Sequence, residues 1–337
     1  MSFENSTGIK RDYSEAQKCI TSLKEHCKSF YQEFEMFKLI TTGPTGAVFK
    51  GIFRKEKNCN RKDLALKFKF GNKKPNHEAT ILRRLKDKHI ANIYGHYTLK
   101  DRECIVMEYY RYGDLESFKR YVLMCSSLSE SLLLYIAGGV IEALNYIHVK
   151  NKIIHMDINP QNILLDNLLD VKLIDFSVSC NYKEPLQTLK LPIVGTRYYM
   201  SPEVLIQKTI DVKELSKIDL YSFGVTLYYL AFGVYPYDLN GIQNNYDQIA
   251  EKIDETNLEF PSDMGCSKLF KNFLINCLHK DIKKRYDIYQ AKNDPWLKGY
   301  QILLDEKENL DNEEVFMNGL RYDYFLNLNE YLHNKCQ

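Results

Sequence analysis

The chain has 337 residues, of which 45% are hydrophobic and 27% are charged, an ordinary composition for a globular protein. Its formal net charge of +2 argues against a nucleic-acid or anionic-membrane partner, since both attract strongly basic surfaces. The nine cysteines lack C-x-x-C spacing, so they indicate neither a disulfide framework nor a zinc site. We therefore expect an intracellular protein, first cytoplasmic and second nuclear, with no signal region and no apolar run long enough to span a bilayer.

The first third of the chain predicts an extension followed by a β-rich lobe. Residues 1–33 form the extension, and the stretch from Tyr13 to Phe34 has the composition of a helix. Within residues 34–110, strand-like runs extend from Glu35 to Ile40, Ala47 to Phe53, Leu64 to Phe70, Ile93 to Leu99 and Cys104 to Tyr109. One helical segment, from His77 to Lys86, interrupts these runs.

The remaining two thirds predict a larger helical lobe over residues 111–298 and a tail over residues 299–337. Long apolar helices are expected from Ser131 to Val149 and from Leu220 to Phe232. In the tail, the acidic stretch from Asp305 to Glu314 is expected to be a solvated surface segment. Side chains expected to pack back on the lobe are Phe316, Tyr322, Tyr324, Phe325, Leu328 and Tyr331.

Two segments of the β-rich lobe carry residues suited to a phosphate ligand. The run LITTGPTGAVFKG at residues 39–51 contains Gly43 and Gly46, and glycine is used where backbone N–H groups must approach an anion closely. By itself such a run is more often a hairpin turn. The strand LALKF at residues 64–68 carries Lys67, and a single lysine on a strand is usually a solvated edge residue.

The helical lobe contains a denser group of polar residues. The run IIHMDINPQNILL at residues 153–165 is followed by LIDFS at residues 173–177. Further downstream come GTRYYMSPE at residues 195–203, DLYSFG at residues 219–224 and Arg285 within KKRY at residues 283–286.

In this order, these segments resemble the motifs of eukaryotic-type protein kinases of the serine/threonine type. HMDINPQN stands for the family's H-R-D-x-K-x-x-N, DFS for D-F-G, and residues 41–48 for G-x-G-x-x-G-x-V with Thr41 at the first glycine position. The resemblance covers residues 34–298. It implies an α+β, bilobal protein-kinase fold with a small antiparallel β-rich N-lobe and a larger, mostly helical C-lobe.

The resemblance also implies a function and its site. The function is ATP-dependent transfer of phosphate to Ser/Thr hydroxyls of a protein substrate, with ATP and Mg²⁺ as cofactors and an oligomeric state that the residues do not indicate. The expected catalytic residues are Asp157, Lys67, Glu78, Asn159 and Thr196. The expected metal ligands are Asn162 and Asp175. The expected nucleotide contacts are Thr41, Gly43, Gly46, Val48, Ala65, Lys67, Met107, Glu108, Tyr110 and Leu164.

Three departures from the family pattern leave a second function open. Asn159 replaces the usual lysine, and Thr41 and Ser177 each replace a glycine, whereas Met156 in place of an arginine is expected to change regulation more than chemistry. Loss of the lysine removes one electrostatic contact to the transferred group, which can be worth about 100-fold in rate. An active but slow kinase is favoured because every metal and base position is kept. The alternative is a pseudokinase that acts as a nucleotide-binding or protein-interaction scaffold.

Overall fold

The protein forms two compact units in the computed structural model. The N-terminal unit runs up to Lys86 and includes Ala91–Tyr109, whereas the C-terminal unit comprises Asp87–Ile90 and the chain from Tyr110 onward. The structure describes residues 32–43, 46–54, 63–69, 77–99, 102–122, 128–182, 187–242, 245–261, 265–310, 316, 318 and 320.

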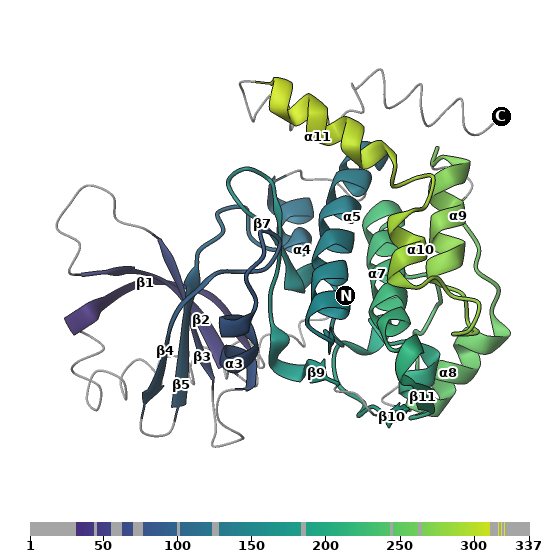
Figure 1. The fold of residues 1–337 in the computed structure, drawn as a ribbon, viewed down its shortest axis with the longest axis horizontal. Helices are drawn as coiled ribbons and strands as arrows, with labels where there is room; N and C mark the ends of the chain where they lie inside the picture. The colour runs from purple at the N-terminus through teal and green to yellow at the C-terminus, as the bar shows by residue number, and fades with distance from the viewer. Residues whose placement is uncertain are drawn as a thin grey trace. The chain divides into compact units, whose positions relative to one another are not determined.

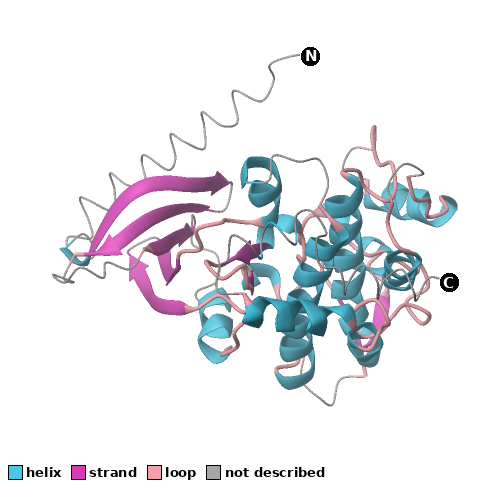
Figure 2. Ribbon diagram, turned by 90° about the horizontal axis from the view of Figure 1, so that it is seen from above, coloured by secondary structure: helices cyan, strands magenta, loops and turns pink. Residues whose placement is uncertain are grey.

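The N-terminal unit is built on a five-stranded antiparallel sheet (Figures 1 and 2). Its strand order is β1-β2-β3-β5-β4, and helix α3 belongs to the same unit. The bounds are β1 Phe34–Gly43, β2 Gly46–Phe53, β3 Leu64–Lys69, α3 His77–Arg84, β4 Ile93–Leu99 and β5 Arg102–Glu108. Because side chains alternate across a strand, Leu64, Leu66 and Phe68 of β3 enter one apolar cluster while Ala65, Lys67 and Lys69 share the other face.

The C-terminal unit is mostly helical and holds its short strands as three two-stranded pairs. Its longer helices are α5 Glu130–Asn145, α7 Ser216–Phe232, α8 Tyr246–Glu255, α9 Lys268–Cys277 and α11 Gly299–Asn309. Its shorter helices are α4 Leu115–Ser117, α6 Pro202–Leu205 and α10 Ile288–Lys292. Its strand pairs are β6 Ile153–Ile154 with β9 Cys180–Asn181, β7 Ile163–Leu165 with β8 Val171–Leu173, and β10 Thr188–Lys190 with β11 Thr209–Asp211.

Helices α5 and α7 form the centre of this unit, and their sequences explain why. Ser129 caps α5 by accepting the N–H of Leu132, and Gly233 ends α7 in the left-handed conformation at φ 72°. Nearly every side chain of both helices is buried. By length and composition alone, Glu130–Lys150 could also cross a membrane, but most of it is buried inside this unit.

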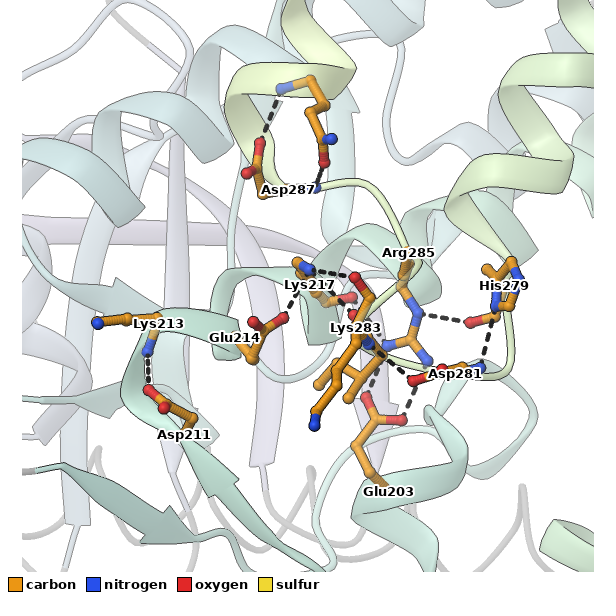
Figure 3. A network of polar contacts seen from close by, with 12 residues as sticks. Glu203, Asp211, Lys213, Glu214, Lys217, His279, Asp281, Lys283, Arg285 and Asp287 are labelled. Carbon is orange, nitrogen blue, oxygen red and sulfur yellow. Dashed lines mark hydrogen bonds and ion pairs between the residues drawn. The ribbon is translucent and has the colours of Figure 1, made fainter.

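The buried side chain of Arg285 connects the segment after α9 to helix α6 (Figure 3). Arg285 is 1% exposed and forms a bidentate ion pair with Glu203, at 2.6 Å from Nη1 to Oε1 and 3.0 Å from Nη2 to Oε2. Its other N–H groups donate to the carbonyl oxygens of His279, Lys217 and Lys280. Since a buried charge is costly unless it is fully paired, this network fixes α6 against the later helices.

The first part of the tail, helix α11, packs within the C-terminal unit. Helix α11 lies across α5 (Figure 1), where an ideal Cβ on Gly138 would come within 2.2 Å of the Tyr300 ring. Lys307 Nζ donates to Tyr135 Oη and to Asp170 Oδ1, both at 2.7 Å. Beyond α11, the buried Phe316 packs edge-on against Tyr135.

The observed elements confirm most of the predictions that fall on described residues. All five predicted strands, the helix near His77 and the two long apolar helices are present, each within a few residues of its predicted bounds. The described part of the predicted solvated segment, from Asp305 to Asn309, is the end of helix α11, and its Asp305 and Glu308 side chains are exposed as predicted. The predicted N-terminal helix lies almost wholly outside the described residues; Gln32 and Glu33 are helical, but Phe34 already begins β1.

Among the tail residues, Phe316 is buried as predicted. The other side chains that were expected to pack back, Tyr322, Tyr324, Phe325, Leu328 and Tyr331, lie outside the described residues.

Gly138→Ala is expected to destabilise the protein although alanine is the better helix former. The added Cβ would collide with Tyr300, and overpacking of this kind costs about 1–3 kcal/mol. Thermal unfolding should therefore begin at a lower temperature, whereas the control Gly265→Ala, which meets nothing within 4 Å, should leave it unchanged. In a Tyr300→Ala background the Gly138→Ala penalty should largely vanish. An unchanged or raised midpoint for Gly138→Ala alone would contradict the docking of α11 on α5.

Candidate active site

The polar residues of the C-terminal unit gather on a loop held at both ends. The loop runs between β6 and β7, which pair with β9 and β8 respectively. The β7–β8 pairing also brings Ile174 beside the loop, and its N–H donates to the carbonyl oxygen of Asn162 at 3.0 Å. Residues that are far apart in sequence, at 157–162 and 174–175, therefore lie close together.

A buried carboxylate of α7 holds the start of this loop. Asp219 is fully buried and accepts the backbone N–H groups of His155 and Met156 at 2.7 and 2.8 Å, as well as a 2.7 Å hydrogen bond from His148 Nε2. Burial alone would raise the pKa of Asp219, but the hydrogen bond and charge of His148 lower it overall, so the group is a carboxylate. Met156 has a left-handed φ of 69°, which these bonds stabilise.

Asp157 is the centre of the hydrogen-bond network. Its Oδ1 accepts the backbone N–H and the hydroxyl of Thr196, both at 2.8 Å, and the Asn159 amide at 3.0 Å. Its Oδ2 accepts the Asn162 amide at 2.9 Å. The carboxylate is thus fixed by donors from two segments of the chain, as a group that must orient a hydroxyl needs to be.

Asn159 performs two structural tasks with one amide. Its Nδ2 approaches both Asp157 and Thr196, the latter at 3.2 Å to Oγ1, while its Oδ1 accepts the N–H of Gln161 at 2.9 Å and caps the 3-10 turn Pro160–Asn162. The side chain is 3% exposed. An asparagine therefore links the carboxylate to the threonine by hydrogen bonds, but without a positive charge.

The two expected metal ligands flank the β7–β8 pair. Asn162 directs its Nδ2 to Asp157, so its Oδ1 is the amide atom suited to a cation. Asp175 adopts a left-handed φ of 62° and accepts the N–H of Ser177 at 3.3 Å. Ser177 lies in the 3-10 turn Phe176–Val178 and has no positive φ, so this backbone does not require the family's glycine.

Phe176 fixes the turn from the other side. Its ring is fully buried and packs edge-on against His155 at 4.8 Å between centroids. His155 Nε2 in turn lies 2.8 Å from the carbonyl oxygen of Ile174. The residues before and after Asp175 are therefore both anchored to the loop that carries Asp157.

A glycine and a stack of tyrosines position the segment that contains Thr196. Gly195 has a φ of 99°, and a Cβ there would lie 2.6 Å from the Met156 carbonyl oxygen. The rings of Tyr198 and Tyr235 stack at 4.8 Å, and those of Tyr235 and Tyr229 at 5.0 Å. The segment after Thr196 is thereby attached to α7.

In the N-terminal unit, Lys67 and Glu78 form the expected ion pair. Lys67 Nζ lies 2.8 Å from Glu78 Oε1, and the carboxylate side chain is only 1% exposed. Glu78 is in the first turn of the short helix α3, where a negative charge is favourable. Lys69 Nζ lies 2.8 Å from the second oxygen, Oε2, a contact that the sequence analysis did not anticipate.

Most of the expected nucleotide contacts lie in the sheet of the N-terminal unit or at its end. Thr41 pairs with Val48 and Gly43 with Gly46 across the β1–β2 hairpin. A Cβ on Gly46 would lie 2.1 Å from the Phe68 carbonyl oxygen, so only glycine fits. Ala65 pairs with Met107, and Glu108 ends β5 with its N–H bonded to the Asn92 carbonyl oxygen. Tyr110 and Leu164 belong to the C-terminal unit, where Leu164 lies on β7.

The donor chemistry within each unit fits Mg²⁺ and a nucleotide. Among the described residues, no group of three or more His, Cys, Asp or Glu side chains could hold a metal ion. One carboxylate, Asp175, and one amide oxygen, on Asn162, suit Mg²⁺, which typically binds through one or two carboxylates together with substrate phosphates. Sequence reasoning missed Asp219 and Lys69 as contributors. Alternation along β3 would have placed Lys69 on the face of Lys67.

The chain is similar in sequence to several named protein kinases. MAP kinase kinase MKK1/SSP32 of Saccharomyces cerevisiae is 32% identical over 258 residues, which cover 72% of this chain and 48% of the relative. MAP kinase kinase skh1/pek1 of Schizosaccharomyces pombe is 33% identical over 70% of this chain and 64% of its own length. Serine/threonine-protein kinase D2 of Rattus norvegicus is 27% identical over 80% of this chain and 30% of its own length.

The chain thus spans less than two thirds of the length of each of these relatives. The family model described as protein kinase domain matches residues 34–297, and this match confirms the predicted bilobal α+β fold. With its motifs in the family's order and its Asp157 network in place, the chain belongs to the protein kinase domain family.

Proposed function

We propose that the protein is an ATP- and Mg²⁺-dependent protein serine/threonine kinase. The observation that carries this proposal is the set of donors that fix the Asp157 carboxylate, contributed by Thr196, Asn159 and Asn162. Phosphoryl transfer needs little covalent chemistry from the protein, so a fixed base and correctly placed oxygen ligands are its main requirements.

Each position that matches the family motifs then has a defined task. Asp157 orients the acceptor hydroxyl and takes its proton, while Asn162 and Asp175 hold Mg²⁺, which supplies positive charge to the phosphates when bound. Lys67, fixed by Glu78, donates to the phosphates, and the Gly43–Gly46 hairpin offers its backbone N–H groups to them. In the N-terminal unit, Val48, Ala65 and Met107 would offer apolar contacts to the base and backbone groups near Glu108 polar ones; Leu164 and Tyr110 are the expected contacts of the C-terminal unit.

The acceptor class follows from Thr196. Its hydroxyl donates to Asp157 and lies 3.2 Å from the Asn159 amide, which matches the family's serine/threonine pattern. The printed names of the similar proteins also describe MAP kinase kinases and a serine/threonine-protein kinase. A protein substrate with a Ser or Thr acceptor is therefore proposed.

The pseudokinase alternative loses support from two details. Asn159 keeps the hydrogen bonds to Asp157 and Thr196, so the network survives the loss of the lysine. Ser177 adopts a conformation that needs no glycine.

An intracellular location is proposed on the four described cysteines, Cys104, Cys180, Cys266 and Cys277, none of which is in a disulfide.

Asp157→Asn is expected to lower phosphate transfer by about 100-fold or more, because the amide cannot accept the hydroxyl proton. Purified protein should be incubated with radiolabelled ATP, Mg²⁺ and mixed protein substrates, while nucleotide binding is measured in parallel and should be retained. Asp305→Asn, which changes an exposed carboxylate of α11, serves as the matched control. Equal transfer by the wild type and Asp157→Asn would overturn the enzyme assignment.

Asn159→Lys is expected to raise kcat by a factor approaching about 100, since it restores a cation beside the transferred group. The same change removes the cap on the Pro160–Asn162 turn, which should cost about 1 kcal/mol of unfolding free energy. In steady-state kinetics kcat should thus rise, whereas in thermal unfolding the midpoint should fall. Asn159→Ala, which loses both the cap and the amide, should lower both quantities. A kcat for Asn159→Lys at or below the wild-type value would show that this position does not limit the rate.

Activity is expected to be independent of phosphorylation near Thr188. Met156 replaces the phosphate-binding arginine and is buried in an apolar cluster with Leu191, Val204 and Ile210. Thr188 is exposed and lies opposite Asp211 in the β10–β11 pair, so a phosphate there would face a like charge.

Phosphatase-treated protein and Thr188→Ala should therefore retain kcat to within about twofold, since no arginine partner for a phosphate is lost. Thr188→Glu should lower the unfolding midpoint, whereas the matched control Thr209→Glu, which lies opposite Lys190, should not. A large loss of activity after phosphatase treatment, restored by phosphate on Thr188, would refute this expectation.

A further inference from the structure

Glu78 is held by two lysines. Its carboxylate is almost fully buried, and its oxygens lie 2.8 Å from Lys67 Nζ and 2.8 Å from Lys69 Nζ, one oxygen for each ammonium group. The lysine side chains are 16% and 26% exposed, so both ammonium groups are partly withdrawn from water. An ion pair with Lys67 alone would be neutral, whereas this triad carries one excess positive charge.

The strand geometry explains why Lys69 reaches Glu78. Residues 67 and 69 of β3 share the face opposite the apolar cluster that contains Leu66 and Phe68. Lys67 pairs with Val48 on β2, and Lys69 pairs directly with Gly46. Lys69 therefore lies beside the hairpin glycine whose backbone is too close to Phe68 to carry a side chain.

Other charged groups near Lys69 do not replace Glu78 as its partner. On β5, the residue paired with Lys69 is Glu103, whose Oε1 lies 3.8 Å from His96 Nε2. The 2.8 Å contact of Lys69 is with Glu78. The Lys69 contact is an ion pair without hydrogen-bond geometry, unlike the Lys67 contact, and removing one partner of a buried ion pair leaves the other charge uncompensated.

We propose that Lys69 is a positioning residue of the nucleotide site, an inference that rests on the proposed kinase function. Lys69 keeps a counter-charge on Glu78 while Lys67 donates to the phosphates. The buried Glu78 carboxylate is therefore still paired with a positive charge when Lys67 contacts the phosphates. The ligand chemistry that Lys69 serves is the phosphate part of a nucleotide, whereas the base is bound independently of it.

The test compares a ligand with phosphates and one without. Dissociation constants for Mg·ADP and for adenosine should be measured by calorimetry on the full chain carrying Lys69→Met. Binding of Mg·ADP should weaken by about tenfold, consistent with loss of one charge-assisted contact, while adenosine binding stays within about twofold of wild type. Lys69→Arg should restore Mg·ADP binding, and Lys38→Met, which changes an exposed lysine of β1, should have no effect.

A double-variant cycle distinguishes positioning from general structural support. In a Glu78→Gln background, Lys69→Met should no longer weaken Mg·ADP binding, because the group through which Lys69 acts has lost its charge. If Lys69→Met fails to fold, Lys69→Gln provides the same comparison, since it keeps a hydrogen-bond donor without the charge. Thermal unfolding without nucleotide reports the folded state of each variant.

Three outcomes would overturn the proposal. They are unchanged Mg·ADP binding in Lys69→Met, an equal loss of adenosine binding, and a loss that persists undiminished with Glu78→Gln. The proposed function fails separately, through absence of phosphate transfer by the wild type. In that case the binding comparison still decides whether Lys69 supports a phosphate-binding lysine.

Discussion

The arrangement of the C-terminal unit depends on one buried carboxylate, Asp219. It accepts the backbone N–H groups of His155 and Met156 and the ring of His148, so the loop cannot detach without leaving these groups unsatisfied. Each such loss costs about 1–3 kcal/mol, and the buried charge itself would add to that cost. Because α7 carries Asp219 and also Tyr229 of the tyrosine stack, one rigid helix sets both the loop that holds Asp157 and the segment that holds Thr196.

The sequence predicted the fold well where local patterns and motif order coincide. The strands of the sheet have alternating faces, and the two central helices are long apolar runs, so their existence follows from periodicity. The tail was predicted less well. Helix α11 has acidic residues that suit a solvated loop equally well, and its place is set by Tyr300 filling the space above Gly138. Such complementarity between residues 162 positions apart leaves no local signal.

The candidate site, too, was predictable from the sequence only in part. The resemblance of HMDINPQN and DFS to kinase motifs pointed to Asp157, Asn162 and Asp175, and the β7–β8 pair brings their backbones together. Only one of the two tasks of Asn159 has a local sequence signal. An asparagine before a proline is a typical cap, whereas its amide contact with Thr196 joins segments that are distant in sequence. The second lysine on Glu78 follows from strand alternation only once the helix is known to start at His77.

The departures from the family pattern at Asn159 and Met156 change the charge of the site more than its geometry. Asn159 forms hydrogen bonds with Asp157 and Thr196, so it supports the shape of the site, but it contributes no charge to the phosphates. Met156 occupies the position of an arginine that would bind phosphate in the family pattern. It packs instead with Leu191 and Ile210, so apolar burial replaces an electrostatic contact. Apolar packing does not depend on a kinase upstream, and a neutral amide cannot match a cation in the transition state. The two residues therefore keep the packing and hydrogen bonds of the loop, while each removes a positive charge that the family pattern places there.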